Sequence, residues 1–154
     1  MNESMVEKVK KILEGIVAGK PVYESCGITP DEVEAVYSLG YTYYQVGRLE
    51  DAETLFRFVT VMDGFDTKYG YALASTLQAE HKFADAAELY GTLVPIDSTN
   101  PAIYSGLAEC RVALGDKKGA QAAFEALVKA VKPDTPERKA AVERAERMIE
   151  GLKS

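Results

Sequence analysis

Apolar residues recur every three or four positions along most of this chain, a spacing that predicts amphipathic α-helices. Near the N-terminus, residues 3–18 carry one apolar stripe made of Met5, Val9, Ile12 and Ile16. Near the C-terminus, residues 136–152 carry another, made of Ala141, Ala145, Met148 and Leu152. The pattern therefore predicts an all-α protein with an amphipathic helix at each end.

The segment between these helices repeats every 34 residues, in three units without gaps: 33–66, 67–100 and 101–134. Each unit shares a leucine, a small residue, an alanine and an aromatic, which are Leu39, Gly40, Ala52 and Phe56, then Leu73, Ala74, Ala86 and Tyr90, then Leu107, Ala108, Ala120 and Phe124. Small residues let two antiparallel helices approach closely, and a larger side chain would overpack the contact by roughly 1–3 kcal/mol. The turn position holds Gly47, His81 and Gly115, which predicts left-handed backbone at the end of each first helix.

Cap-then-proline pairs mark the starts of three helices, at Thr29–Pro30, Asn100–Pro101 and Thr135–Pro136. Thr29 with Glu32 has the spacing of a capping box. Pro95 is expected to end or bend the second helix of the middle unit, because proline cannot donate a backbone hydrogen bond. These signals agree with the boundaries of the repeats.

A 34-residue helix–turn–helix unit of this kind is typical of the tetratricopeptide repeat (TPR). We expect an all-α, right-handed TPR solenoid of three helix–turn–helix repeats, forming a single domain over residues 1–154. Because a stack of repeats leaves an apolar face open at each end, the flanking helices at 3–18 and 136–152 are expected to cap it. The N-terminal stripe of Met5, Val9, Ile12 and Ile16 has a second interpretation as a homodimer contact. Residues 19–27 are expected to be a connector.

Composition excludes several classes of function. The chain has 154 residues, 47% of them hydrophobic, and a net charge of −6 with no run of lysine or arginine, so nucleic acid is not an expected partner. His81 is the single histidine and lies in a predicted turn, and neither Cys26 nor Cys110 has the spacing of a metal site or a catalytic motif. We therefore expect no enzyme activity, catalytic residue, metal or cofactor. Without a signal peptide or a membrane-spanning segment, an intracellular protein with reduced thiols is expected.

In TPR stacks the first helix of each unit lines a concave groove. Three tyrosines, Tyr37, Tyr41 and Tyr44, share one face of the first such helix, while Tyr43 is expected to pack inside. Tyrosine suits peptide binding because it offers a large apolar body, a polar tip and only two torsions to fix. The predicted groove residues are Tyr37, Tyr41, Tyr44, Lys68, Tyr71, Ser75, Gln78, Ser105 and Glu109. Since Lys68 is accompanied by Glu34 and Glu109, a clamp for a peptide carboxylate is not expected.

Four stretches make the chain resemble the class II chaperones of type III secretion translocators, over residues 28 to 130. They are ITPDEVEAVYSLGYTYYQVGRLEDAETLF, MDGFDTKYGYAL, KFADAAELYGTLVPIDSTNP and GLAECRVALGD. YALAST is a departure, because the family usually has a glycine-rich stretch there. The resemblance implies a chaperone of the bacterial cytoplasm that holds hydrophobic translocators by an extended segment with proline–leucine–proline anchors. It also implies that Tyr90 joins the groove aromatics, unless its role is purely structural, and that the N-terminal helix can mediate dimers.

Two alternatives remain at this point. A generic TPR scaffold or adaptor, with a possible role as a transcriptional co-regulator, would have no affinity for an apolar, proline-containing peptide. A regulatory subunit or small enzyme would bind a small molecule, for which the sequence offers no site.

Overall fold

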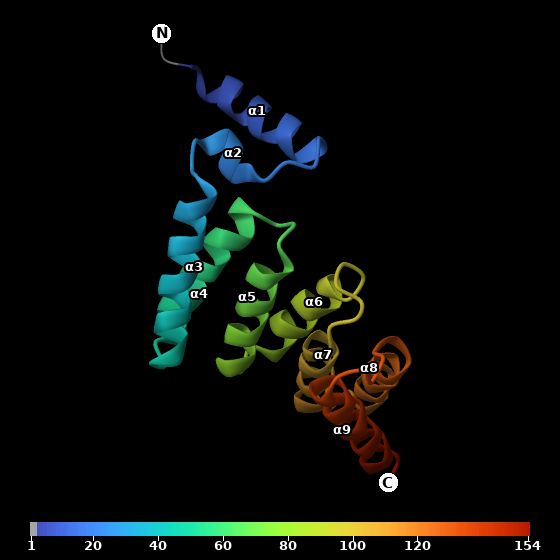
Figure 1. The fold of residues 1–154 in the computed structure, drawn as a ribbon. Helices are drawn as coiled ribbons and strands as arrows, with labels where there is room; N and C mark the ends of the chain where they lie inside the picture. The colour runs from blue at the N-terminus through green and yellow to red at the C-terminus, as the bar shows by residue number, and fades with distance from the viewer. Residues whose placement is uncertain (1–2) are drawn as a thin grey trace. The chain divides into compact units, whose positions relative to one another are not determined.

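The computed structural model describes residues 3–154, and this part of the chain is built from nine α-helices without a strand (Figure 1). The helices are α1 (Met5–Val17), α2 (Val22–Cys26), α3 (Pro30–Gln45), α4 (Leu49–Met62), α5 (Thr67–Ala79), α6 (Phe83–Leu93), α7 (Pro101–Ala113), α8 (Lys117–Ala130) and α9 (Pro136–Lys153). The predicted all-α fold class is confirmed. The three repeats correspond to the helix pairs α3–α4, α5–α6 and α7–α8.

Contacts divide the chain into two compact units, each larger than one repeat, with the boundary inside α5. From here on, the first unit is Met1–Leu73 and the second unit is Ala74–Ser154. Each unit is described by itself. The extent of the TPR domain over residues 1–154 stays a prediction.

The local signals in the sequence produce the expected helix ends. The Thr29 side chain accepts a hydrogen bond from the Glu32 backbone N–H at 3.2 Å, and the Glu32 carboxylate accepts one from the Thr29 N–H at 2.8 Å, which completes the capping box. α6 ends at Leu93, two residues before Pro95. His81 adopts a φ of 61°, close to the 79° of Gly47 and 78° of Gly115, so a histidine occupies the left-handed turn position in the middle repeat.

In the first unit, α3 packs along α4, and the repeat's small residue makes this approach possible. A Cβ atom added to the buried Gly40 would lie only 2.8 Å from Cε1 of Phe56. Phe56 is 1% exposed, and the core around it also contains Val33, Ala52 and Val59. The close contact predicted from the repeat pattern is therefore present.

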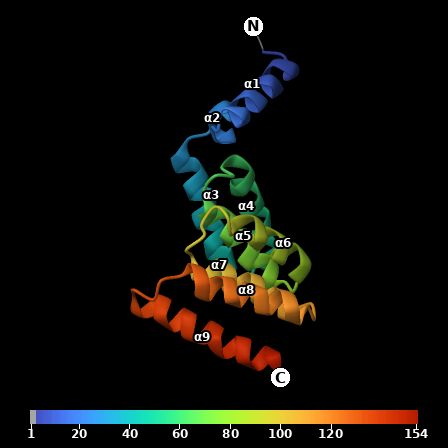
Figure 2. The same ribbon diagram turned by 90° about the vertical axis from the view of Figure 1, so that its right-hand side faces the viewer.

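In the second unit, α7 packs against α6 and α8, and α9 covers α8 and part of α7 (Figure 2). α9 buries Ala145 and half-buries Ala141, Met148 and Leu152, which are the residues of its predicted stripe. The remaining surface of α9 is rich in charged residues. The C-terminal helix thus lies over the end of the last repeat in the manner expected of a cap.

The N-terminal end differs from the prediction. Residues 22–26, expected to be part of a connector, form the short helix α2, and α1 packs against this helix. The apolar stripe of α1 is not buried, and Met5, Val9 and Ile16 are exposed. Leu39 is 46% exposed although its repeat equivalents Leu73 and Leu107 are buried, because α1 does not cover this face of α3. The capping role predicted for the N-terminal helix is therefore wrong for this arrangement.

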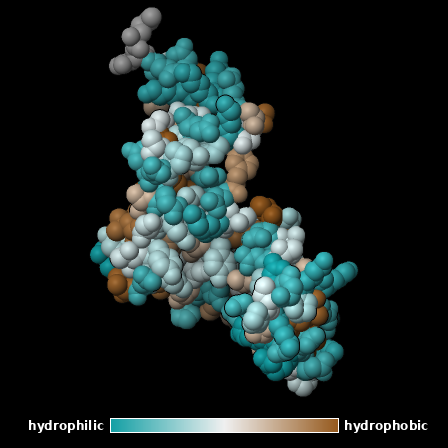
Figure 3. All heavy atoms as spheres, viewed as in Figure 1, coloured by the Kyte–Doolittle hydropathy of each residue, from teal (hydrophilic) through white to brown (hydrophobic). Residues whose placement is uncertain are grey.

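Exposed apolar side chains are otherwise dispersed. On the face seen in Figure 3, hydrophobic atoms form separate brown areas within a mostly hydrophilic surface. Single exposed apolar residues are normal on protein surfaces. The stripe of α1 differs because Met5, Val6, Val9, Leu13, Ile16 and Val17 are all exposed on one 13-residue helix. A contiguous patch of this kind indicates a contact with another molecule.

Candidate functional site

The three tyrosines of α3 are neither fully buried nor fully solvated. Tyr41 is 49% exposed, and Tyr37 and Tyr44 are half-buried. The Tyr37 ring lies between aromatic neighbours, with its centroid 5.7 Å from Phe56, 5.3 Å from Tyr69 and 6.5 Å from Tyr41. Tyr37 therefore connects the core to the surface, whereas Tyr41 offers most of its ring to a ligand.

An ion pair covers the exposed side of the Tyr37 ring. Nζ of Lys68 lies 2.8 Å from Oε2 of Glu34 and 4.8 Å from the centroid of Tyr37. The buried Tyr69 hydroxyl donates to the same Glu34 oxygen at 3.1 Å. The hydrogen bond from Lys68 lowers the pKa of Glu34, and the same contact raises the pKa of Lys68. Both charges are thus held in place beside an aromatic ring, where a cation is favourable.

We call the set Tyr37, Tyr41, Tyr44, Lys68 and Tyr71 the tyrosine surface of the first unit. Tyr71, at the middle of α5, is half-buried. Tyr69 was not predicted to belong here, yet it supports Tyr37 from below. Tyr69 is adjacent to Lys68 and two residues before Tyr71, and tyrosine occurs on buried and on exposed helix faces, so the sequence gave no sign of its burial.

Tyr43 departs from the prediction that it packs inside. It is half-buried, and the guanidinium of Arg48 lies 4.3 Å from the centroid of its ring. By helical periodicity Tyr43 lies on a different face of α3 from Tyr37, Tyr41 and Tyr44, and its ring has a cation as one neighbour. This makes Tyr43 a useful internal comparison for the other tyrosines of α3.

The corresponding positions of the second unit are polar and form a hydrogen-bonded network. Tyr90 is 2% exposed, and its hydroxyl donates to Oε1 of Gln78 at 3.0 Å and lies 3.2 Å from Oγ of Ser75. Nε2 of Gln78 donates to Oε2 of Glu109 at 3.1 Å. The buried Tyr90 therefore acts on this surface from beneath, through its hydroxyl. Ser105, another predicted groove residue, is half-buried on α7.

Arg144 completes this network and was missed by the sequence analysis. Its Nη2 donates to Oε1 of Glu109 at 2.7 Å. Arg144 belongs to α9, which the sequence analysis interpreted only as a cap. The sequence of α9 could have indicated this contact. Arg144 is adjacent to the buried Ala145 and three residues from Ala141, so it lies at the edge of the apolar stripe that faces the repeats. We call Ser75, Gln78, Tyr90, Glu109 and Arg144 the polar network of the second unit.

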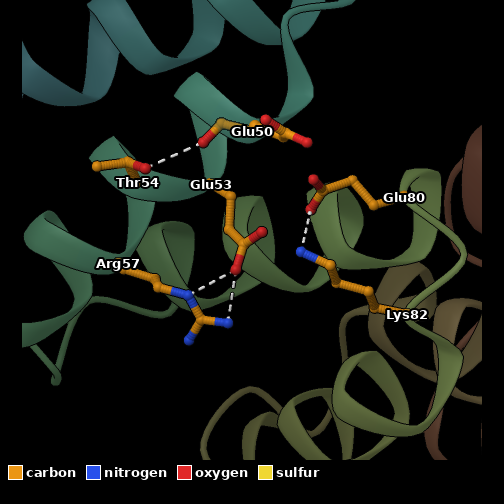
Figure 4. Close-up of polar contacts among 6 residues, drawn as sticks. All are labelled: Glu50, Glu53, Thr54, Arg57, Glu80 and Lys82. Atoms are coloured by element: carbon orange, nitrogen blue, oxygen red, sulfur yellow. Dashed lines mark hydrogen bonds and ion pairs between the residues drawn. The ribbon is translucent and has the colours of Figure 1, made fainter.

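Other charged residues are paired locally (Figure 4). On α4, Nη2 of Arg57 lies 2.7 Å from Oε1 of Glu53, and the Thr54 hydroxyl donates to the Glu50 carbonyl at 3.0 Å. In the turn before α6, Nζ of Lys82 lies 3.4 Å from Oε2 of Glu80. The Glu53–Arg57 pair has the i,i+4 spacing that stabilises a helix by roughly 0.2–0.5 kcal/mol. The side chains of Glu53 and Glu80 are only 13% and 9% exposed, so these carboxylates lie close to the packed part of the protein.

The described residues show no arrangement suited to bond chemistry. Cys110 is buried, and burial raises its pKa to about 11, so its thiol is a poor nucleophile at neutral pH. Cys26 is an exposed free thiol, and His81 is exposed with its ring against Phe83. Among residues 3–154, no three histidine, cysteine, aspartate or glutamate side chains are grouped closely enough to hold a metal ion.

Comparison with known proteins supports the repeat assignment. Two tetratricopeptide-repeat family models match the chain, at residues 33–64 and 77–145. The chaperone protein SicA of Salmonella dublin is 27% identical over 126 residues, which are 80% of this chain and 75% of SicA. The crystal structure of PcrH, a protein of Pseudomonas aeruginosa, in complex with the chaperone-binding region of PopD has a TM-score of 0.76 and 28% identity, covering 82% of this chain and 95% of PcrH.

A third relative comes from Yersinia enterocolitica. The crystal structure of the type III secretion chaperone SycD with a peptide of the translocator YopD has a TM-score of 0.75 and 27% identity, covering 81% of this chain and 95% of SycD. The chain belongs to the tetratricopeptide-repeat family, and these chaperones of type III secretion are its relatives. Another crystal structure of SycD, with a TM-score of 0.74 and 27% identity, covers 81% of this chain and 94% of SycD and is described as an alternative dimer. No helix within residues 3–154 of this chain is long and apolar enough to cross a membrane.

Proposed function

We propose that this chain is a cytoplasmic chaperone that binds an extended segment of a hydrophobic type III secretion translocator and keeps that protein soluble before export. The observation that carries the proposal is the tyrosine surface, on which Tyr41 presents about half of its side chain to solvent. The complexes of PcrH with PopD and of SycD with a YopD peptide support it.

The tyrosine surface has the chemistry that such a segment requires. Apolar anchors of an extended peptide gain free energy by packing on tyrosine rings, and the hydroxyl groups can bond to peptide backbone that would otherwise lose water. The Tyr37 ring of α3 is already ordered by Phe56, Tyr69 and the Glu34–Lys68 ion pair. A preformed surface loses less conformational entropy on binding, which favours affinity.

The chaperone effect follows from mass action. A translocator segment with membrane-inserting properties aggregates through exposed apolar surface, and a protein that binds the non-native chain lowers its free concentration. The mechanism requires no nucleotide, and the residues described offer no site for bond chemistry. Release would be driven by the secretion machinery.

The test compares two tyrosines of one helix. Tyr41→Ala is expected to weaken binding of a short synthetic peptide with proline–leucine–proline anchors about tenfold, because an exposed aromatic anchor is removed. Tyr43→Ala, on the other face of α3, is the matched control and should keep the affinity. Isothermal titration calorimetry measures the affinity, and circular dichroism melts check that both variants remain folded.

A peptide with aspartate in place of leucine gives the second comparison and should not bind. Equal affinities of the wild type for both peptides would contradict the chaperone proposal and favour a generic scaffold that binds folded proteins.

We also propose that the apolar stripe of α1 mediates a homodimer, as predicted from the sequence for Met5, Val9, Ile12 and Ile16. Support comes from the exposure of Met5, Val9 and Ile16 and from the dimer described for SycD. The double variant Val9→Asp/Ile16→Asp should halve the mass measured by light scattering, since it places charges in an apolar contact. Lys11→Asp, on the opposite face of the same helix, is the control, and loss of the dimer in that variant would argue against the stripe.

A further inference from the structure

We propose that Arg144 of the C-terminal helix is part of the ligand-binding surface of the second unit, where its guanidinium binds an acceptor oxygen of the client segment. The inference rests on the proposed function and extends it to a residue outside the repeats. The client oxygen is either a side-chain carboxylate or a main-chain carbonyl, both of which accept hydrogen bonds from a guanidinium.

The network that holds Arg144 is fixed from the core outward. The Tyr90 ring is buried and its hydroxyl sets the orientation of the Gln78 amide, whose Nε2 then donates to Glu109. Arg144 donates to the other oxygen of that carboxylate at 2.7 Å. Residues of α5, α6, α7 and α9 are thereby joined in one chain of hydrogen bonds, so the guanidinium has a defined place.

The guanidinium of Arg144 has hydrogen-bond donors that the network does not use. A guanidinium has five N–H groups, and within residues 3–154 the hydrogen bonds of Arg144 use only Nη2, toward Glu109. The Arg144 side chain is 52% exposed, so its remaining donors face solvent. Glu109, by contrast, has both carboxylate oxygens engaged, by Gln78 and by Arg144. This surface therefore offers hydrogen-bond donors to a ligand, whereas its carboxylate is already occupied and is not available to a cationic ligand.

Ligand binding by Arg144 is a different role from the capping of the repeats by α9. The capping function of α9 is carried by its apolar stripe, in which Ala145 is buried. Arg144 lies at the edge of the stripe and reaches α7 through its polar head. Arg147, one turn further along the same helix, is exposed and takes part in none of the hydrogen bonds or ion pairs of residues 3–154. Arg144, unlike Arg147, is therefore held beside Glu109, a residue of the predicted groove.

The experiment uses the full chain and two synthetic peptides with proline–leucine–proline anchors, one flanked by aspartate and one by alanine, which has no side-chain acceptor. Arg144→Met keeps the aliphatic stem, which preserves packing on α9, and removes every donor; Arg147→Met is the matched control. We expect Arg144→Met to weaken binding about tenfold, the range of a hydrogen bond to a charged group, while Arg147→Met matches the wild type. Calorimetric affinities at low and high salt and thermal melts are the measurements.

The two peptides distinguish the source of the acceptor oxygen. A loss confined to the aspartate peptide, and reduced at high salt, identifies a client carboxylate, whereas equal losses with both peptides identify a backbone carbonyl. Unchanged affinity of Arg144→Met for both peptides would overturn the inference while leaving the chaperone proposal intact. A wild-type chain that binds neither peptide would remove the proposed function, and this inference with it.

A further variant tests whether Arg144 also acts by positioning Glu109. Glu109→Gln keeps the shape of the side chain and removes its charge. If the two residues act as one unit, the double variant with Arg144→Met should bind no more weakly than Arg144→Met alone. Additive losses would show that Arg144 contacts the client independently of Glu109, which supports the direct contact. A loss with Glu109→Gln but none with Arg144→Met would contradict it.

Discussion

Phe56→Ala is expected to lower the free energy of unfolding by about 3–5 kcal/mol, the usual cost of truncating a fully buried phenylalanine. Phe56 is 1% exposed, and its ring lies against Gly40 and against the Tyr37 ring at 5.7 Å between centroids. The truncation would leave a cavity between α3 and α4 and withdraw support from Tyr37. Chemical denaturation followed by circular dichroism measures the change.

Phe58 supplies the matched control for this prediction. It lies two residues further along α4 but is 39% exposed, so Phe58→Ala should lower the free energy of unfolding by only about 1–2 kcal/mol, clearly less than Phe56→Ala. Similar losses for the two variants would show that the buried face of α4 is not the one described. A loss at Phe58 alone would contradict the packing of α4 against α3.

Gly106→Ala is expected to destabilise the protein by about 3 kcal/mol, at the upper end for an overpacked core. An added Cβ atom would clash with Cζ of Tyr90 and lie 2.7 Å from its Cε1 and Cε2 atoms, and the Tyr90 ring is buried and cannot move into solvent. The ring and its hydroxyl would have to shift together. We therefore expect the variant also to disturb the hydrogen bond between Tyr90 and Gln78.

Gly91→Ala is the control for the same substitution in a helix with free space. Gly91 lies in α6, and nothing lies within 4 Å of its added Cβ atom. Alanine should then stabilise the protein by about 0.5–1 kcal/mol, because glycine loses more backbone entropy on folding. Thermal and urea melts of both variants give the comparison. Destabilisation by Gly91→Ala of the same size as by Gly106→Ala would show that steric contact with Tyr90 is not the cause.

Much of the fold follows from residues whose effect is local. Thr29 with Glu32 sets the start of α3, and Pro95 limits α6, because each acts through backbone groups within a few positions in sequence. The repeat also predicts buried partners such as Phe56 and Ala52, since a period of 34 residues places equivalent residues in equivalent contacts. His81 shows that a turn position can be recognised even where the preferred glycine is missing.

Features that depend on distant packing could not be predicted in this way. Leu39 is equivalent to the buried Leu73 and Leu107 in sequence, and its exposure depends on where α1 packs. The helix α2 is only five residues long, so its intrinsic signal is weak and its neighbours decide its conformation. The role of Arg144 could not be predicted for a related reason, because its partner Glu109 lies 35 residues away on another helix. Tyr43 belongs to the same class, since its half-buried position beside Arg48 depends on the packing around it.

On α3, the tyrosine that is held in place and the tyrosine that is offered to solvent are different residues. Tyr37 is fixed by Phe56 and Tyr69, whereas Tyr41 contributes far less to packing. Evolution can therefore exchange Tyr41 for another residue, and so shift the range of cargoes carried, without endangering the scaffold that displays it.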